Sequence, residues 1–349
     1  MLEKISLFSL TFDQYCQEVV SRLNKGGLHA GILYSQWYRY GAFDSTHPAF
    51  SNAQSLFKKI VEITDVSMPP INQVYEEGDT YKFTVDVGGE VESVIIPMKT
   101  GLTLCVSSQV GCQRGCRFCE TGRMGLLKQL SAKEIVAQFL HAKFTFKKPI
   151  RNVVFMGMGE PFDNFDVVHQ AVKILSDDHG LSVGQRHITI STSGVVPGIE
   201  KMIKDMHPGI NLAISLSAPN DEKRMRIMPI NRHWNMATIK TALKKYCQSR
   251  KRSVMVSYVL LKGVNDAIDD ADQLITFCDE LDVKINLIPY NPQRQRPYLA
   301  SDIETMDAFA SHLKQKGLIV LYRKTKGQSI MAACGQLGKR KTQLELLSI

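Results

Sequence analysis

The chain has 349 residues, 44% of them hydrophobic, and carries 43 lysines and arginines against 34 aspartates and glutamates. This length allows one large core with a smaller appended domain. No stretch reaches the apolar length of a membrane span, and the first residues lack the basic start and apolar run of a signal peptide, so we expect a cytoplasmic protein without a membrane partner. The net charge of +9 suits a polyanionic partner.

Residues 1–65 form the first predicted unit. Apolar positions recur there at roughly helical spacing and are interrupted at Gly26-Gly27 and at His47-Pro48, which predicts a small helical domain. The segment 37–40 places three aromatic rings beside an arginine. Such a segment could stack on nucleic-acid bases, but packing in the domain core is the favoured interpretation.

A β-hairpin is predicted within the linker 66–98. Alternating residues at 80–85 lead to a turn at Gly88-Gly89, and a second strand returns at 91–97. Residues 99–317 then alternate short apolar strands with amphipathic helices, and Ser131 begins a capping box for one of these helices. The six predicted strands cover residues 102–106, 152–156, 187–191, 211–215, 253–260 and 284–288.

Six strand–helix units in series predict an α/β fold, a partial or full (βα)6 barrel with a parallel sheet and helices outside. The loops at the carboxyl ends of the strands should form the active face. Residues 318–349 form the last predicted unit. It contains an added strand at 318–322, a small-residue segment around Cys334 and a basic run at 339–341.

Three of the eight cysteines fall in one short loop. Cys112, Cys116 and Cys119 have the spacing Cys-x3-Cys-x2-Cys, and Gly111 and Gly115 let the backbone fold tightly around a bound group. Three thiolates can hold three irons of a [4Fe-4S] cluster and leave the fourth open for a substrate or cofactor. Structural zinc is a weaker interpretation because no second cysteine pair is present, and a disulfide framework is weaker still.

Polar residues follow several of the predicted strands. Gly159 and Glu160 follow the second strand, where glycine would bring bare backbone close to a ligand and the carboxylate could receive an ammonium or a ribose hydroxyl. Ser191, the segment 215–217 and Asn291 end later strands. Any one of them could be a simple polar cap, but their recurrence at one rim favours a cofactor site.

Two further cysteines have no clear assignment from their surroundings alone. Cys105 lies within the first predicted strand, where a buried structural thiol would be ordinary. Cys334 lies among small residues that would allow close approach by a large ligand. A structural role and a functional role remain equally good interpretations of each.

These residues resemble the radical S-adenosylmethionine (SAM) superfamily, and within it the RlmN/Cfr family of RNA adenine methyltransferases. The cysteine spacing, the Gly159-Glu160 pair and the serial strand–helix units carry the superfamily resemblance. The match to the family covers about residues 90–340 and is poor over the first 65. It rests on six strings in order, at 105–112, 157–161, 191–197, 218–221, 285–289 and 332–337.

The resemblance implies a [4Fe-4S] cluster on the three loop cysteines and two molecules of SAM per turnover. One SAM would methylate Cys334 to S-methylcysteine, and cleavage of the second would give a 5′-deoxyadenosyl radical that takes hydrogen from this methyl group. The carbon radical on Cys334 would add to adenine and join protein to RNA. Cys105 would then resolve the adduct through a transient disulfide with Cys334. Glu92 would be the proton acceptor, although its sequence context alone favours a solvated strand carboxylate.

The implied activity is methylation of an adenosine carbon in 23S rRNA, tRNA or both, with carbon 2 favoured and carbon 8 as the alternative. The implied electron donor is a protein such as flavodoxin or ferredoxin, and we expect a monomer. By resemblance, the first 65 residues would help to dock the RNA. The residues implied as SAM contacts are Gly159, Glu160, Ser191, Ser215, Leu216, Ser217 and Asn291.

Two residues depart from the family pattern. Glu120 stands where relatives commonly have Ala or Ser, and its charge should disfavour cluster reduction unless Arg117 or Arg123 neutralises it. Ser217 stands in place of the usual histidine and cannot titrate as an imidazole. These departures keep a non-catalytic iron–sulfur RNA-binding protein as an alternative. A radical SAM enzyme that modifies another protein is less suitable, because it would not need both outlying cysteines.

Overall fold

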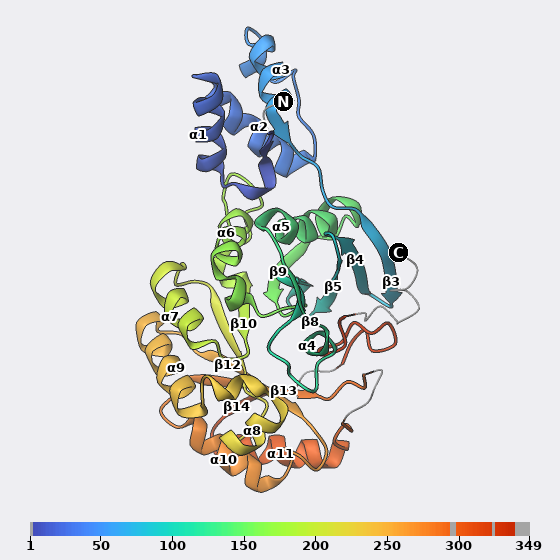
Figure 1. The fold of residues 1–349 in the computed structure, drawn as a ribbon, viewed down its shortest axis with the longest axis vertical. Helices are drawn as coiled ribbons and strands as arrows, with labels where there is room; N and C mark the ends of the chain where they lie inside the picture. The colour runs from blue at the N-terminus through green and yellow to red at the C-terminus, as the bar shows by residue number, and fades with distance from the viewer. Residues whose placement is uncertain (1–2, 294–297, 323–324, 339–349) are drawn as a thin grey trace.

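The computed structural model describes residues 3–293, 298–322 and 325–338, so the basic run at 339–341 lies outside the described residues. Its main element is one sheet in the strand order β14-β13-β12-β11-β10-β9-β6-β5-β4-β3. Figure 1 shows the helices α7 to α11 along the outer side of this sheet and the N-terminal helices projecting from one end. The sheet strands are β3 (Ile71–Glu77), β4 (Thr80–Asp86), β5 (Glu90–Met98), β6 (Gly101–Cys105), β9 (Ile150–Phe155), β10 (Ile188–Thr192), β11 (Asn211–Ser215), β12 (Val254–Leu260), β13 (Val283–Pro289) and β14 (Ile319–Tyr322).

The parallel half of the sheet confirms the predicted fold class. All six predicted strands are present as β6 and β9 to β13, and β14 adds a parallel neighbour to β13. Their apolar runs form strands because both faces are covered, and the central residues of β10, β11 and β12 are almost fully buried. The carboxyl ends of these strands therefore meet along one edge, which is where the polar residues were predicted to gather.

The predicted hairpin is also present, as β4 and β5, and β5 continues the sheet by pairing antiparallel with β6. The sequence did not reveal β3, which pairs antiparallel with β4 at the edge of the sheet. It also did not reveal a separate two-stranded sheet of β7 (Gln109–Cys112) and β8 (Gly125–Gln129). This small sheet frames the three clustered cysteines, which makes it important for the site.

The helices predicted in the first 65 residues are present as α1 to α3, and a two-stranded pairing of β1 (Ile5–Ser6) with β2 (Thr64–Asp65) closes this part. Trp37 and Tyr38 are buried, which confirms core packing for these two rings, whereas Tyr40 is 68% exposed. Ser131 caps its helix as predicted. The helices are α1 (Phe12–Leu23), α2 (Gly27–Tyr40), α3 (Gln54–Ile63), α4 (Glu120–Met124), α5 (Ala132–Leu140), α6 (Phe165–Leu175), α7 (Val196–Asp205), α8 (Asp221–Ile227), α9 (Met236–Arg250), α10 (Ile268–Cys278) and α11 (Ile303–Gln315).

The N-terminal helices are fastened to the loop after α6. Asp177 accepts a hydrogen bond from the Phe12 backbone N–H at 2.7 Å, and the Tyr34 hydroxyl lies 3.4 Å from the same carboxylate. Within the described ranges, no helix is long and apolar enough to cross a membrane. The unit boundaries at residues 65, 98 and 317 stay predictions.

Candidate active site

The cysteine loop, residues 112–119, is closed at its base by the small sheet. Cys112 in β7 is in register with Gly125 in β8. Gly111 has φ +76°, and a Cβ atom there would lie 1.9 Å from the Gly125 carbonyl oxygen, so only glycine allows the two strands to meet. The predicted tight turn is therefore present, and it brings the three thiols together.

The three thiols lie in a buried environment with hydrogen-bond donors around them. Burial raises the pKa of Cys112, of Cys116 to about 12, and of Cys119. Donors oppose this shift, because the Arg114 backbone N–H bonds Cys112 and the Thr121 hydroxyl and backbone N–H bond Cys119. Such donors stabilise sulfur that is deprotonated by a metal and tune iron–sulfur clusters.

This donor set suits a cluster that is held through several irons. Cys116 and Cys119 raise the pKa of Cys112, and Cys119 raises that of Cys116, so the three thiols lie within electrostatic range of one another. A single zinc ion needs its thiolates about 2.3 Å away, whereas a [4Fe-4S] cluster is held through several separate irons.

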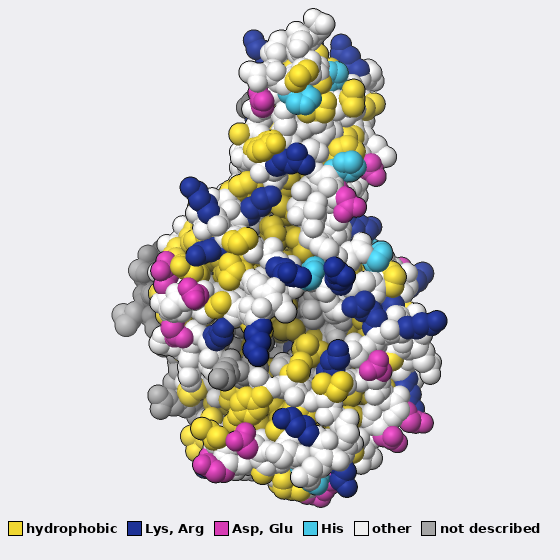
Figure 2. Space-filling view, turned by 180° about the vertical axis from the view of Figure 1, so that it is seen from behind, with side chains coloured by type: hydrophobic (Ala, Val, Ile, Leu, Met, Phe, Trp, Pro, Cys, Tyr) yellow, Lys and Arg dark blue, Asp and Glu magenta, His cyan; other side chains and the backbone are white. Residues whose placement is uncertain are grey.

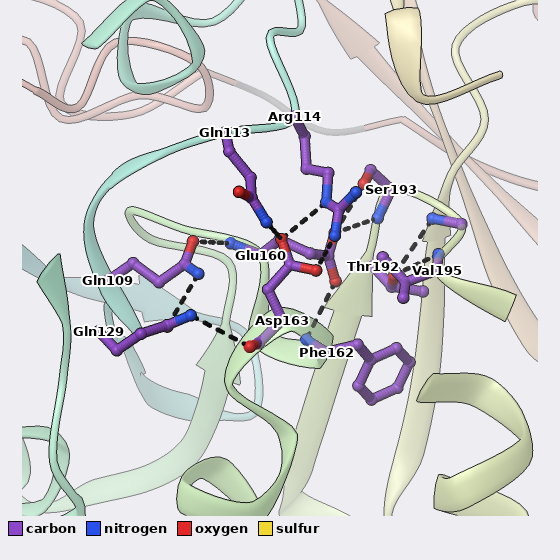
Figure 3. A network of polar contacts seen from close by, with 11 residues as sticks. Gln109, Gln113, Arg114, Gln129, Glu160, Phe162, Asp163, Thr192, Ser193 and Val195 are labelled. Atoms are coloured by element: carbon purple, nitrogen blue, oxygen red, sulfur yellow. Dashed lines mark hydrogen bonds and ion pairs between the residues drawn. The ribbon is translucent and has the colours of Figure 1, made fainter. Parts of the chain in front are cut away.

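Glu160 lies beside these thiols and is held in place by Ser193, which the sequence placed in the string 191–197 without a role of its own. It is 3% exposed, and its charge raises the pKa of Cys112 and Cys116. The Ser193 backbone N–H and hydroxyl both donate to Glu160 Oε2 at 2.7 Å, and the Phe162 N–H donates to Oε1 at 3.1 Å (Figure 3). Three uncharged donors therefore hold the carboxylate in place, and it can still accept a hydrogen bond from an ammonium group.

The segment that carries Glu160 is bound to the cysteine loop and to its framing sheet. Figure 3 shows the Arg114 guanidinium paired with the Asp163 carboxylate and the Gln109 side chain accepting from the Glu160 backbone N–H, the latter at 2.8 Å. Gly159 leaves room for Gln109, because a Cβ atom there would lie 2.7 Å from the Gln109 Cβ. The bare backbone of Gly159 thus makes space for a protein side chain, and its contact with SAM stays a prediction.

The other predicted SAM contacts line up at the carboxyl edge of the parallel strands. Ser191 is in register with Ala213 and lies next to the end of β10, and Ser215 ends β11. Leu216 and Ser217 are buried just beyond it. Ser217 has φ +51°, a strained conformation for a residue with a side chain, and its hydroxyl accepts from the Val259 N–H at 3.4 Å.

The Cys334 loop, residues 325–338, is docked directly on the cysteine loop and α4. The Glu120 N–H donates to the Gly335 carbonyl at 2.8 Å, and the Thr121 hydroxyl donates to the Leu337 carbonyl at 2.6 Å. Gln293 donates to the carbonyls of Phe118 and Gly335. Figure 1 shows this red segment beside α4.

The Cys334 thiol is therefore close to the predicted cluster ligands. Its charge raises the pKa of Cys119, which places the two sulfurs within electrostatic range. The predicted SAM contact Asn291 donates to the Cys334 carbonyl at 3.1 Å and accepts from Thr325 at 3.1 Å. In this structure, then, the amide of Asn291 holds the loop that carries Cys334.

Glu92 and Cys105 lie on the same side of the sheet near this loop. Val94 is in register with Cys105, and Glu92 is two residues from Val94, so all three side chains point to one face. Glu92 is 7% exposed, which shows that the solvated interpretation of this carboxylate was wrong. Its Oε2 accepts from the Gly338 N–H at 3.3 Å and lies 3.7 Å from the Lys82 ammonium.

The transient disulfide between Cys105 and Cys334 stays a prediction, as do the individual roles of the site residues. The unusual Glu120 is 9% exposed and lies 4.0 Å from the Arg123 guanidinium. Of the two arginines expected to neutralise it, Arg123 forms an ion pair with it.

One buried oxygen near the predicted SAM contacts has no hydrogen-bond partner within the described part of the chain. It is the hydroxyl of Ser108, beside Gly159. Buried polar atoms are nearly always paired, so an unpaired one at this rim fits a site that a polar ligand completes. The sequence placed Ser108 in the string 105–112 but gave its hydroxyl no role.

Comparison with known proteins agrees with this geometry. The model of the radical SAM superfamily matches residues 106–277. The fold is similar to the crystal structure of a radical SAM methyltransferase from Sphaerobacter thermophilus, with a TM-score of 0.87 and 32% identity over 95% of this chain and 99% of that one. The fold and site thus define a SAM-dependent radical SAM enzyme of the methyltransferase class, with a [4Fe-4S] cluster and SAM as cofactors.

The relatives in sequence specify the family. The chain is 48% identical to the probable dual-specificity RNA methyltransferase RlmN 1 of Protochlamydia amoebophila over 96% of this chain and 94% of the relative. It is 34% identical to the dual-specificity RNA methyltransferase RlmN of Bdellovibrio bacteriovorus over 99% of this chain and 87% of that relative. The protein belongs to the RlmN family, which confirms the resemblance recognised in the sequence.

Proposed function

We propose that this protein methylates a carbon atom of an adenosine in RNA, in 23S rRNA, tRNA or both. The relatives that span nearly the whole chain are named dual-specificity RNA methyltransferases. The single observation that carries the proposal for this chain is the docking of the Cys334 loop on the cysteine loop. It brings a thiol from the C-terminal segment to the predicted cluster ligands, as transfer of a methyl group through Cys334 requires.

The residues have separate roles in this proposal. When bound, the cluster and SAM supply a carbon-centred oxidant that removes a hydrogen atom from a methyl group. Cys334 carries that methyl group as S-methylcysteine and forms the bond to the adenine carbon. Glu92 accepts the proton lost from that carbon, and Cys105 attacks the Cys334 sulfur to release the product through a transient disulfide. Glu160 and the polar residues at the strand ends bind SAM, two molecules of which are used per turnover.

Surface charge supports RNA as the substrate. Figure 2 shows Lys and Arg side chains around a recess in the middle of one face, with acidic side chains mostly toward the edges of that view. Together with the net charge of +9, this distribution favours a polyanion over a small neutral substrate. We further propose a cytoplasmic monomer that receives its electron from a protein such as flavodoxin or ferredoxin.

The test is methylation of RNA by the reconstituted enzyme with methyl-labelled SAM. Labelled 2-methyladenosine in rRNA or tRNA, identified by mass spectrometry of nucleosides, is the expected product, and 8-methyladenosine would move the proposal to carbon 8. Absence of label in both RNAs while SAM is still cleaved would refute the RNA assignment.

Two cysteine variants test the proposed thiol roles. Cys334→Ala should carry no methyl group and form no RNA adduct, whereas Cys105→Ala should accumulate an adduct that survives denaturation. Cys247→Ala is the matched control, because Cys247 is a half-buried thiol on α9, outside the site, and its removal should leave methylation unchanged. Absence of an adduct in Cys105→Ala would contradict the proposed pair of thiols.

A further inference from the structure

A fully buried cation, Arg224 on α8, has no part in the function proposed above. It is 0% exposed, and its guanidinium donates to three uncharged acceptors. These are the carbonyl oxygen of Ser193 at 2.6 Å, the carbonyl oxygen of Leu216 at 3.3 Å and Asn231 Oδ1 at 2.9 Å. Burying a cation without a bonded carboxylate is strongly unfavourable, so its retention here requires a physical reason.

The three acceptors connect Arg224 to two loops at the rim of the site. Ser193 follows β10 and holds Glu160 through its N–H and hydroxyl. Leu216 follows β11, between two of the predicted SAM contacts. The rigid guanidinium fork therefore fixes the loops after two neighbouring strands relative to each other. Asn231 is itself fixed, because its amide donates to Asp221 Oδ1 at 2.8 Å.

Arg224 also lies on a helix that is bonded to the cysteine loop. The Arg117 backbone N–H donates to the carbonyl of Ile227, at the end of α8, at 2.9 Å. A positive charge near an iron–sulfur cluster favours the thiolate ligands and the reduced cluster, which carries one more negative charge. Through Ser193, Arg224 also faces the segment that carries Glu160, so its charge opposes the charge of that carboxylate.

Ser193 keeps these two opposite charges from pairing directly. Its carbonyl faces the guanidinium of Arg224, while its N–H and hydroxyl face the carboxylate of Glu160. A direct ion pair would occupy the carboxylate that has to receive the ammonium group of SAM. Because Ser193 lies between them, Arg224 can balance the negative charge of the site while the Glu160 carboxylate stays available to SAM.

We propose that Arg224 is a positioning residue that aligns the loops after β10 and β11 for SAM and supplies the counter-charge of the iron–sulfur cluster. This inference rests on the proposed assignment of the three loop cysteines to the cluster. It predicts two separable effects, one on the affinity for SAM through the hydrogen bonds and one on the reduction potential through the charge.

The experiment compares reconstituted holoenzymes with Arg224→Met, Arg224→Lys and the control Arg250→Met. Arg250 is 8% exposed and also donates to three backbone carbonyls, but these lie at the end of α7, away from the cysteine loop. The readouts are the dissociation constant for SAM, the midpoint potential of the cluster followed by electron paramagnetic resonance, and thermal unfolding.

We expect Arg224→Met to weaken SAM binding at least tenfold and to shift the midpoint potential to more negative values. Arg224→Lys should keep a potential near that of the wild type but still bind SAM more weakly, because one ammonium group cannot reach all three acceptors. Arg250→Met should lower thermal stability and leave both other readouts unchanged.

Wild-type affinity and potential in Arg224→Met would overturn the inference, as would equal changes in Arg250→Met. If Arg224→Met does not fold, Arg224→Lys decides the positioning role, since wild-type SAM affinity in that variant would refute it. Both readouts are independent of RNA. A wild type that binds the cluster and SAM but methylates no RNA would therefore refute the proposed function and leave this inference about Arg224 unaffected. A wild type without any cluster would refute the cysteine assignment itself.

Discussion

Replacing Gln293 with leucine should release the Cys334 loop from the cysteine loop. Gln293 is 3% exposed, donates to the carbonyls of Phe118 and Gly335, and accepts from Arg123 at 2.7 Å. Leucine has a similar size but can neither donate nor accept. The substitution therefore removes the polar bridge between the two loops with little change in volume.

The size of the effect follows from the bonds lost. Each buried hydrogen bond contributes about 0.5–1.5 kcal/mol net, and opening of the loop breaks the bond from Gln293 to Gly335, so its loss should favour opening by about 1 kcal/mol. This corresponds to roughly a fivefold larger opening constant. The other docking bonds, from Thr121 and from the Glu120 N–H, should keep the loop attached for most of the time.

Hydrogen exchange of peptides from residues 325–338 and alkylation of Cys334 by iodoacetamide measure this opening. When reclosing is fast, both rates follow the opening constant and should rise by about the same factor of five. Gln36→Leu is the control, because Gln36 is 7% exposed and bonds only within the N-terminal helical part, to Asp44. Unchanged exchange and alkylation in Gln293→Leu would refute the docking role of this glutamine.

Three more predictions concern charge and hydrogen bonding at the site. Ser193→Ala removes the hydroxyl donated to Glu160 at 2.7 Å, so SAM affinity measured by calorimetry should fall about tenfold, and unchanged affinity would show that this bond is dispensable. Arg123→Met removes the cation that lies 4.0 Å from Glu120, so the midpoint potential of the cluster should become more negative; a constant potential would contradict the neutralising role. Burial raises the pKa of Cys116 to about 12, so this thiol is protonated at neutral pH before iron binds. Cluster binding must expel that proton, so this thiol alone should raise the affinity by up to about tenfold per pH unit, which titration of proton release during reconstitution can check.

The sequence predicted the strands whose residues are buried on both faces. β11 was predicted with its observed bounds, because Asn211–Ser215 is a compact apolar run between helical segments. β3 was missed because it is a half-exposed edge strand with polar residues such as Gln73 and Glu76. β7 and β8 were missed because their pairing is set by the close approach of Gly111 to Gly125, which leaves no periodic pattern.

The site shows the same difference between residues that the sequence reveals and residues that only the folded chain reveals. Motif residues such as Glu160 could be recognised from the sequence, but the groups that hold them could not. Arg224 lies in a helix of mostly charged residues, Asp221–Ile227, which reads as a solvated surface helix, yet its side chain is completely buried. Gln293 and Ser193 act across 175 and 33 positions of the sequence, respectively, so only the folded chain reveals their partners.

The way the Cys334 loop is docked suits a residue whose sulfur must change its chemical state. The hydrogen bond that the described structure places on Cys334 uses its backbone carbonyl, and the neighbouring contacts use the carbonyls of Gly335 and Leu337. Methylation of the sulfur would therefore remove none of these bonds. With Arg123 beside Glu120, the charge that had kept a non-catalytic protein as an alternative is compensated by a neighbouring cation. Both features favour a working methyltransferase, in which the backbone of the Cys334 loop stays fixed beside the cysteine loop while the sulfur of Cys334 changes its chemical state.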